Sequence, residues 1–314
     1  MNLKYQEQSH IMVSAEWHPG WFTEHSNGGG SIALKRVYSR ITAFILVILL
    51  LAISGCTAKE NPKLEVATGT SLIADIVKNV GGDKVEVVNI VPPAACPGHF
   101  DLKPGDVQKL AGARLFLRHD WQGSMFTREL IESVHNKDLQ VVEIAVAGNW
   151  MAPPVQKEAV AKIAGILVEK DPSNRAYYEQ NAGRLVSEIE SKGKEALSRL
   201  QAAGAGGVKV LCSEMQQGFL KWAGFDVVAT YGRPEELNPQ KMQELINKGK
   251  QAGVKLVVDN LQSGPDAGKG MAKELGAAQV TISNFPGGLP QTDTWSAALD
   301  KNVDLLLDAL KERR

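Results

Sequence analysis

The feature that most constrains the fold is an alternation of short apolar runs with amphipathic segments, on both sides of one long helical stretch. Before that stretch, the runs that predict strands are residues 63–68, 85–91, 115–117 and 140–146. After it, they are residues 208–211, 225–230, 254–258 and 279–282. Strands that alternate with helices are typical of parallel sheets flanked by helices. The sequence therefore predicts an α/β fold with two lobes.

The helical stretch spans residues 173–203 and has one narrow apolar stripe. The stripe consists of Tyr178, Ala182, Leu185, Ile189, Ala196 and Leu200. Its other faces are largely charged, as expected for a helix that packs along one side. We interpret it as a long rigid helix that joins the lobes. The expected division is a first lobe over 63–152, linking helices over 153–204 and a second lobe over 205–314.

The N-terminal region predicts export. Lys35, Arg36 and Arg40 precede an apolar run from Ile41 to Ile53, which has the length of a signal-peptide core and is short for a membrane span. The sequence Ile-Ser-Gly-Cys that ends at Cys56 resembles a bacterial lipobox, which implies cleavage before Cys56 and a lipid anchor on it. We therefore expect a signal peptide over 35–56, a polar tether over 57–62, and a mis-set translation start that accounts for residues 1–34.

Charge and motifs exclude several functions. The 35 basic and 35 acidic residues balance, and nucleic-acid binding usually requires a clustered basic surface. The chain contains no Gly-x-Ser-x-Gly elbow, no phosphate-binding loop and no His-Glu-x-x-His pair. An enzyme with Cys212 as nucleophile and His99 as base is the least favoured interpretation, so we expect a binding protein and no nucleic-acid partner.

The segment from Pro92 to Asp106 is the strongest candidate for a binding loop. It holds four prolines and two glycines and follows a predicted buried strand, so it should be a stiff loop at a strand end. Ligands of open α/β sheets bind at the carboxyl ends of strands. The loop carries Cys96 and His99, which are both metal-ligating residue types.

These features together resemble the metal-binding solute-binding lipoproteins of bacterial ABC importers, the zinc and manganese class. Three segments carry the resemblance in addition to the lipobox. They are Pro92-Pro93 with His99-Phe100-Asp101-Leu102-Lys103-Pro104, the stretch Asp171–Tyr178, and Ala272–Gly276. The resemblance implies a two-lobe fold with a rigid linking helix, capture of a metal between the lobes, and an ABC permease as partner.

In that family, four side chains from both lobes hold one metal ion. The first ligand position corresponds to His99 and the second, two residues before Trp150, corresponds to Gly148, which has no donor side chain. The third corresponds to Glu214, or to Ser213 in an alignment shifted by one residue. The fourth corresponds to Ser283 or Asn284. Two of the four family positions therefore lack their usual donors.

Two cysteines offer a replacement for the missing donors. Cys96 lies three residues before His99, and Cys212 lies two residues before Glu214. Cys96, His99, Cys212 and Glu214 would form a four-coordinate site suited to Zn²⁺, with His119 as a spare donor. The alternative is a disulfide between Cys96 and Cys212, because an exported protein permits one. Trp150 and Asn284 are expected to line the cleft.

The function that these features favour is capture of a divalent transition metal, zinc in preference to manganese, by a lipid-anchored monomer that delivers it to an ABC import permease. One alternative is a binding protein for a metal complex or a small organic ligand, with a degenerate metal site. Another is a surface adhesin.

Overall fold

A computed structural model describes residues 62–101, 103–122 and 131–312 of the protein. The chain divides into two units, residues 1–61 and residues 62–314, and all described residues belong to the second. The predicted signal peptide, the N-terminal extension and the lipobox Cys56 lie outside the described residues.

The second unit contains two parallel four-stranded sheets. The first consists of β1 (Leu64–Thr68), β2 (Val85–Asn89), β3 (Leu115–His119) and β4 (Gln140–Ile144), in the order β2-β1-β3-β4. The second consists of β5 (Lys209–Ser213), β6 (Asp226–Tyr231), β7 (Leu256–Asn260) and β8 (Ala278–Ile282), in the order β6-β5-β7-β8. The prediction of two parallel sheets flanked by helices is confirmed. The exact lobe boundaries remain a prediction.

Both sheets have the same topology, and this topology sets where ligands can bind. In each sheet the first strand is central, the second lies at one edge, and the third returns to the other side of the first. This reversal creates a switch point beyond the carboxyl ends of β1 and β3, and another beyond β5 and β7. Open α/β sheets bind ligands at such points.

Helices flank both sheets, as expected. The first half contains α2 (Ser71–Gly81) and α3 (Pro104–Ala111), and residues 131–134 are also helical. They are followed by α5 (Pro153–Lys170) and α6 (Arg175–Ala202). The second half contains α7 (Gln217–Trp222), α8 (Pro239–Ala252), α9 (Lys269–Leu275) and α10 (Trp295–Glu312). Helix α5 begins with Pro153 and Pro154, and proline is well suited to the first helical turn.

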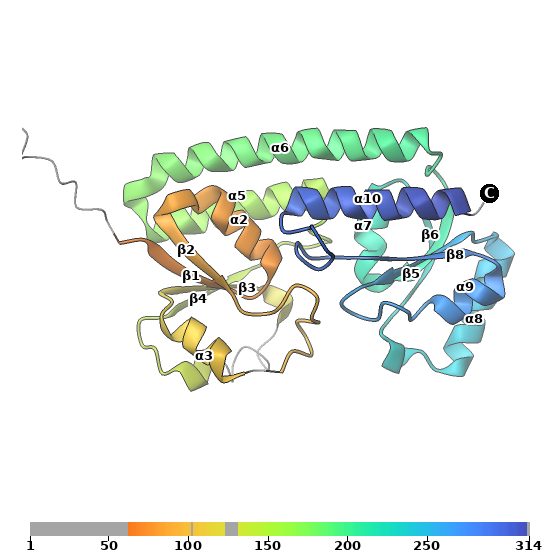
Figure 1. Cartoon of the computed structure of the whole chain (residues 1–314), viewed down its shortest axis with the longest axis horizontal. Helices are drawn as coiled ribbons and strands as arrows, with labels where there is room; N and C mark the ends of the chain where they lie inside the picture. The colour runs from red at the N-terminus through yellow and green to blue at the C-terminus, as the bar shows by residue number, and fades with distance from the viewer. Residues whose placement is uncertain (1–61, 102, 123–130, 313–314) are drawn as a thin grey trace, which may run out of the picture. The chain divides into compact units, whose positions relative to one another are not determined.

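Helix α6 runs along both halves of the unit, as Figure 1 shows. It contacts α2 and α5 along its N-terminal part and α10 along its C-terminal part (Figure 1). Of the predicted apolar stripe, Tyr178, Ala182, Ile189, Ala196 and Leu200 are buried. The long linking helix is confirmed, and its apolar stripe is the surface that packs.

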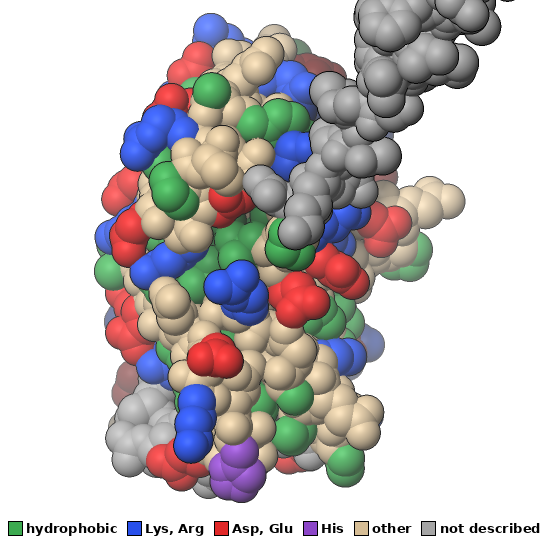
Figure 2. All heavy atoms as spheres, turned by 90° about the vertical axis from the view of Figure 1, so that its left-hand side faces the viewer, with side chains coloured by type: hydrophobic (Ala, Val, Ile, Leu, Met, Phe, Trp, Pro, Cys, Tyr) green, Lys and Arg blue, Asp and Glu red, His purple; other side chains and the backbone are tan. Residues whose placement is uncertain are grey.

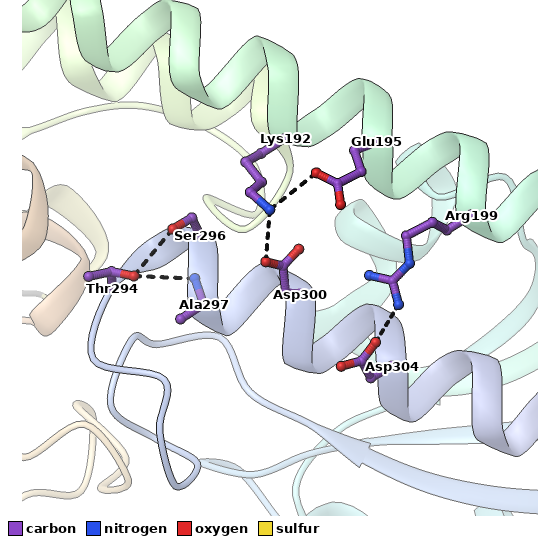
Figure 3. A network of polar contacts seen from close by, with 8 residues as sticks. All are labelled: Lys192, Glu195, Arg199, Thr294, Ser296, Ala297, Asp300 and Asp304. Atoms are coloured by element: carbon purple, nitrogen blue, oxygen red, sulfur yellow. Dashed lines mark hydrogen bonds and ion pairs between the residues drawn. The ribbon is translucent and has the colours of Figure 1, made fainter.

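Ion pairs add a polar link between α6 and α10 (Figure 3). Lys192 lies 3.0 Å from Asp300 and 3.1 Å from Glu195, and Arg199 pairs with Asp304. These side chains are partly exposed, so each pair contributes at most about 1 kcal/mol. Apolar packing is therefore the main force that holds α6 in place.

The apolar core is continuous between the two halves. One buried cluster includes Ile73 and Leu117 of the first half, Tyr178 of α6, and Val258 and Leu299 of the second half. Two smaller clusters cover the other faces of the sheets, one against α8 and α9 and one against α3. The two sheets are thus parts of one packed body.

No helix within the described residues is long and apolar enough to span a membrane.

Figure 2 shows one end of the molecule, where basic and acidic side chains are intermixed. That face offers no basic patch of the kind that nucleic acids require.

Two glycines of α6 provide a test of this packing. A methyl group on Gly193 would lie 2.8 Å from Pro153 Cγ, whereas one on Gly183 would meet nothing within 4 Å. Overpacking costs about 1–3 kcal/mol, and replacing a helical glycine by alanine gains about 1 kcal/mol. We expect Gly193→Ala to lower the free energy of unfolding by about 1 kcal/mol and Gly183→Ala to raise it by a similar amount. Urea denaturation measures both, and changes of the same sign would contradict the packing of α6 on α5.

Candidate metal site

The loop that follows β2 brings Cys96 and His99 together. The His99 backbone N–H donates to the Cys96 carbonyl over 3.1 Å, which closes a tight turn. The Cys96 Sγ and His99 Nδ1 atoms lie 3.9 Å apart. His99 is exposed and Cys96 is half-buried. The turn therefore presents one sulfur and one nitrogen donor on the surface of the first half.

Arg233 reaches this turn from the second half. It follows β6, and its Nη1 atom lies 2.7 Å from His99 Nδ1 and 3.1 Å from Nε2. Its Nη2 atom donates to Cys96 Sγ over 3.4 Å. A guanidinium group carries only donors, so the His99 nitrogen it contacts accepts. Arg233 thus occupies the donor face that a metal ion would use.

The structure does not bring Cys212 to this turn. The predicted loop position of Cys212 was wrong, because β5 continues to Ser213 and Cys212 pairs in register with Thr230 and Val258. Its side chain is fully buried in the apolar core. Burial raises the pKa of the thiol to about 12, which disfavours the thiolate that binds metals. Both cysteines are free thiols, so the alternative disulfide is absent.

The other predicted donors are also separate from the turn. Glu214 is exposed directly after β5. His119, at the end of β3, is 1% exposed and its Nε2 atom lies 2.9 Å from Thr70 Oγ1. Its ring stacks on Trp121 and meets Trp150 edge to face. Within the described residues, no three His, Cys, Asp or Glu side chains lie close enough to hold a metal ion.

Both predicted cleft residues link the halves, Trp150 through its carbonyl, which accepts from Trp295 Nε1 over 2.9 Å, and Asn284 through its side chain. Trp150 is 3% exposed, and its Nε1 atom donates to the Val146 carbonyl. Asn284 Oδ1 accepts from Asn149 Nδ2 over 2.8 Å. Both amides also donate to the Met215 carbonyl. This network of Asn149, Asn284 and Met215 was not predicted, because neutral amides carry no distinctive pattern in a sequence.

The residues expected at the second and fourth ligand positions, Gly148 and Ser283 or Asn284, lie in settings unsuited to metal binding. Gly148 has a φ of 108°, which residues with a side chain rarely adopt. A Cβ there would lie 3.1 Å from Val155. Ser283 is 1% exposed and its hydroxyl donates to the Phe285 carbonyl and accepts from Gln262. Gly148 has no donor side chain, and the Ser283 hydroxyl and Asn284 Oδ1 are already engaged in hydrogen bonds.

Comparison with known proteins decides the family. Residues 66–309 match the model of the family described as ZnuA, zinc-uptake complex component A, periplasmic. The chain belongs to the ZnuA family. The relatives of this chain are substrate-binding proteins of metal ABC transporters and not enzymes.

Two curated relatives illustrate the range of this family. A manganese ABC transporter substrate-binding lipoprotein, PsaA of Streptococcus anginosus, is 27% identical over 251 residues, covering 70% of this chain and 80% of its own. An iron ABC transporter substrate-binding lipoprotein, MtsA of Streptococcus pyogenes serotype M1, is 26% identical and covers 88% of this chain and 99% of its own. These ZnuA-family relatives are named for different metals, so membership alone does not fix the cargo.

Solved structures support the same fold. A ZnuA crystal structure has a TM-score of 0.65 at 20% identity, and the match covers 79% of this chain and 99% of the ZnuA chain. A manganese-bound periplasmic metal-binding protein from Candidatus Liberibacter asiaticus has a TM-score of 0.67 at 19% identity, with coverages of 79% and 100%. These likenesses confirm the ZnuA-type two-lobe architecture.

The buried state of His119 predicts how stability depends on pH. Burial lowers its pKa from 6.5 to about 3, so only the unfolded chain takes up a proton between these values. The contribution of the neutral, buried His119 to the free energy of unfolding is therefore complete above pH 6.5 and is lost as the pH falls toward 3. Between pH 6.5 and pH 5 the loss is about 2 kcal/mol.

The measurement is the free energy of unfolding at several pH values. We expect the acid-side slope to flatten in His119→Gln, whatever the change in absolute stability. His135→Asn is the matched control, because His135 is exposed and its replacement should leave the slope unchanged. Equal slopes in wild type and His119→Gln would contradict the prediction.

Proposed function

We propose that the protein captures a divalent transition metal outside the cytoplasm and delivers it to an ABC import permease, with zinc favoured over manganese. The observation that carries this proposal is the turn that presents Cys96 and His99 side by side, with Sγ and Nδ1 3.9 Å apart. Sulfur with imidazole nitrogen suits Zn²⁺ better than Mn²⁺, which prefers oxygen ligands.

The family supports the location and the partner. Relatives of the chain are named lipoproteins of ABC transporters, so the protein works as an extracytoplasmic, membrane-anchored component. Cys56, in the lipobox-like sequence, is the proposed attachment point of the lipid. The polar residues that follow it would form the tether to the folded body.

Arg233 determines how a metal could bind. A bare cation at Cys96 and His99 would lie beside the guanidinium, and two charges about 4 Å apart repel by several kcal/mol near a protein surface. Metal capture therefore requires Arg233 to leave the turn. Glu214, exposed beyond the end of β5, which pairs with β6, is the proposed third donor once Arg233 has moved.

The same residue supports a second candidate cargo, a metal bound by its own anionic ligand. Arg233 would then remain and pair with the anion, as guanidinium groups do with carboxylates. The two missing family donors, at Gly148 and at Ser283 or Asn284, would be replaced by donors of the co-ligand. Citrate is a suitable probe because its carboxylates chelate metals and match a guanidinium fork.

The first test is calorimetric titration of the reduced, lipid-free protein with Zn²⁺. We expect Cys96→Ala and His99→Ala each to weaken binding at least about tenfold, which corresponds to 1.4 kcal/mol. Cys212→Ala is the matched control, because this thiol is buried in the core and its loss should leave zinc affinity unchanged. Absence of zinc binding in wild type, or an equal loss in Cys212→Ala, would refute the Cys96–His99 site.

Arg233→Gln distinguishes the two cargoes. Removal of the positive charge should strengthen binding of bare Zn²⁺ at least about threefold, since the repulsion disappears. It should weaken binding of zinc citrate at least about tenfold if the anion pairs with the guanidinium. Stronger binding of the bare ion with no effect on zinc citrate supports the free metal, and the reverse result supports the complex.

A further inference from the structure

A pocket lies where α2, α5, α6 and the start of α10 meet. Its volume is about 480 Å³, which falls within the usual range for small-molecule sites. None of its lining residues belongs to the Cys96–His99 turn or to the Asn149 network. Its walls come from elements of both halves, so it is a feature of the whole body.

Asp75 of α2 places a buried carboxylate in this pocket. The side chain is 8% exposed, and its Oδ2 atom accepts the Trp295 backbone N–H over 3.3 Å. A side-chain hydrogen bond from Asn79 and the charge of Lys78 also stabilise the ionised carboxyl. Burial raises the pKa of Asp75 to about 6, although Lys78 and the hydrogen bonds oppose this shift. At neutral pH the group is therefore a carboxylate, buried at a cost that a bound cation would reduce.

Gln156 of α5 adds a second acceptor. It lines the pocket and is 1% exposed, yet its Oε1 atom has no hydrogen-bond partner. A buried carbonyl oxygen without a donor costs about 1–3 kcal/mol. Glu188 of α6 contributes a further carboxylate to the lining. A ligand rich in hydrogen-bond donors would satisfy these groups.

The positive groups at the pocket are already neutralised. Lys192 lies between Asp300 and Glu195, as Figure 3 shows. The first turn of α10 is capped, because Thr294 Oγ1 accepts the Ala297 N–H over 3.2 Å. An anion would find neither a free ammonium group nor a free helix end here. The electrostatics thus favour a cation.

Apolar side chains form the rest of the wall. Leu185 and Ile189 of α6 and Trp295 of α10 line the pocket. Indole rings attract organic cations, by about 0.5–2 kcal/mol. A hydrated metal ion would gain nothing from these surfaces, whereas an amine with a hydrocarbon body would use both kinds of wall.

We propose that this pocket binds a small organic ammonium ion, with its N–H donors on Asp75 and Gln156 and its hydrocarbon body against Ile189 and Trp295. This pocket shares no residue with the candidate metal site, so a ligand binds at one site without using the residues of the other. Because α2 and α10 belong to different halves, the bound amine links them directly.

The test is calorimetric titration at neutral pH with benzylammonium, and with benzyl alcohol as a neutral analogue of similar shape. We expect wild type to bind benzylammonium and to bind benzyl alcohol at least about tenfold more weakly, because the alcohol lacks the charge that Asp75 pairs with. Asp75→Asn should weaken benzylammonium binding at least about tenfold. Thermal unfolding of this variant checks that it is folded.

Two further variants give the controls. Asp226→Asn removes an exposed carboxylate at the start of β6 and should leave benzylammonium affinity unchanged. Ser296→Phe keeps every charge but fills the pocket, so it should abolish binding. No binding by wild type, or equal binding by wild type, Asp75→Asn and Ser296→Phe, would overturn the proposal.

Discussion

The packing of α6 against both halves is the constraint on which the rest of the structure depends. Its buried stripe, from Tyr178 to Leu200, belongs to a core that runs from the first sheet to the second without interruption. Folding this core places the carboxyl-end loops of both sheets within reach of each other. The resulting contacts include Gln262 Nε2 with the Pro93 carbonyl at 2.9 Å and Ser71 Oγ with the Pro286 carbonyl at 2.7 Å. The candidate metal site exists because apolar packing far from it fixes the relation between the loops.

Within that frame, the candidate site has an unusual set of side chains. His99 lies beside Cys96. Gly148 has a positive φ and the Ser283 hydroxyl is engaged in hydrogen bonds. The amides of Asn149 and Asn284 connect the two halves. The candidate site thus combines two metal-binding donors with a neutral amide bridge and an arginine. The positive charge of Arg233 beside the donors is the physical basis for considering both a free metal and an anionic complex.

The fold was largely predictable from the sequence, and the site only in part. Strand and helix periodicity reflects burial on one face, and this signal is strong in segments such as 254–258 and 239–252. The fate of Cys212 was not predictable, because whether β5 ends before or after this residue depends on pairing with Thr230 and Val258 rather than on local sequence. The contact of Arg233 with His99 joins residues 134 positions apart. Such a contact depends on how the chain is arranged in space, so no local sequence pattern indicates it. The burial of His119 and Trp150 in the core was likewise not predictable, because their side chains are polar or amphipathic.

A single side chain, Arg233, covers the donors of the candidate site, and this has a kinetic meaning. Rotation of a partly exposed side chain takes picoseconds to nanoseconds, whereas collective domain movements take microseconds to milliseconds. The continuous core under α6 resists the slower movement, but it does not restrict the guanidinium. For the cargo site proposed at Cys96 and His99, exposing the donors therefore requires only the fast movement of one side chain.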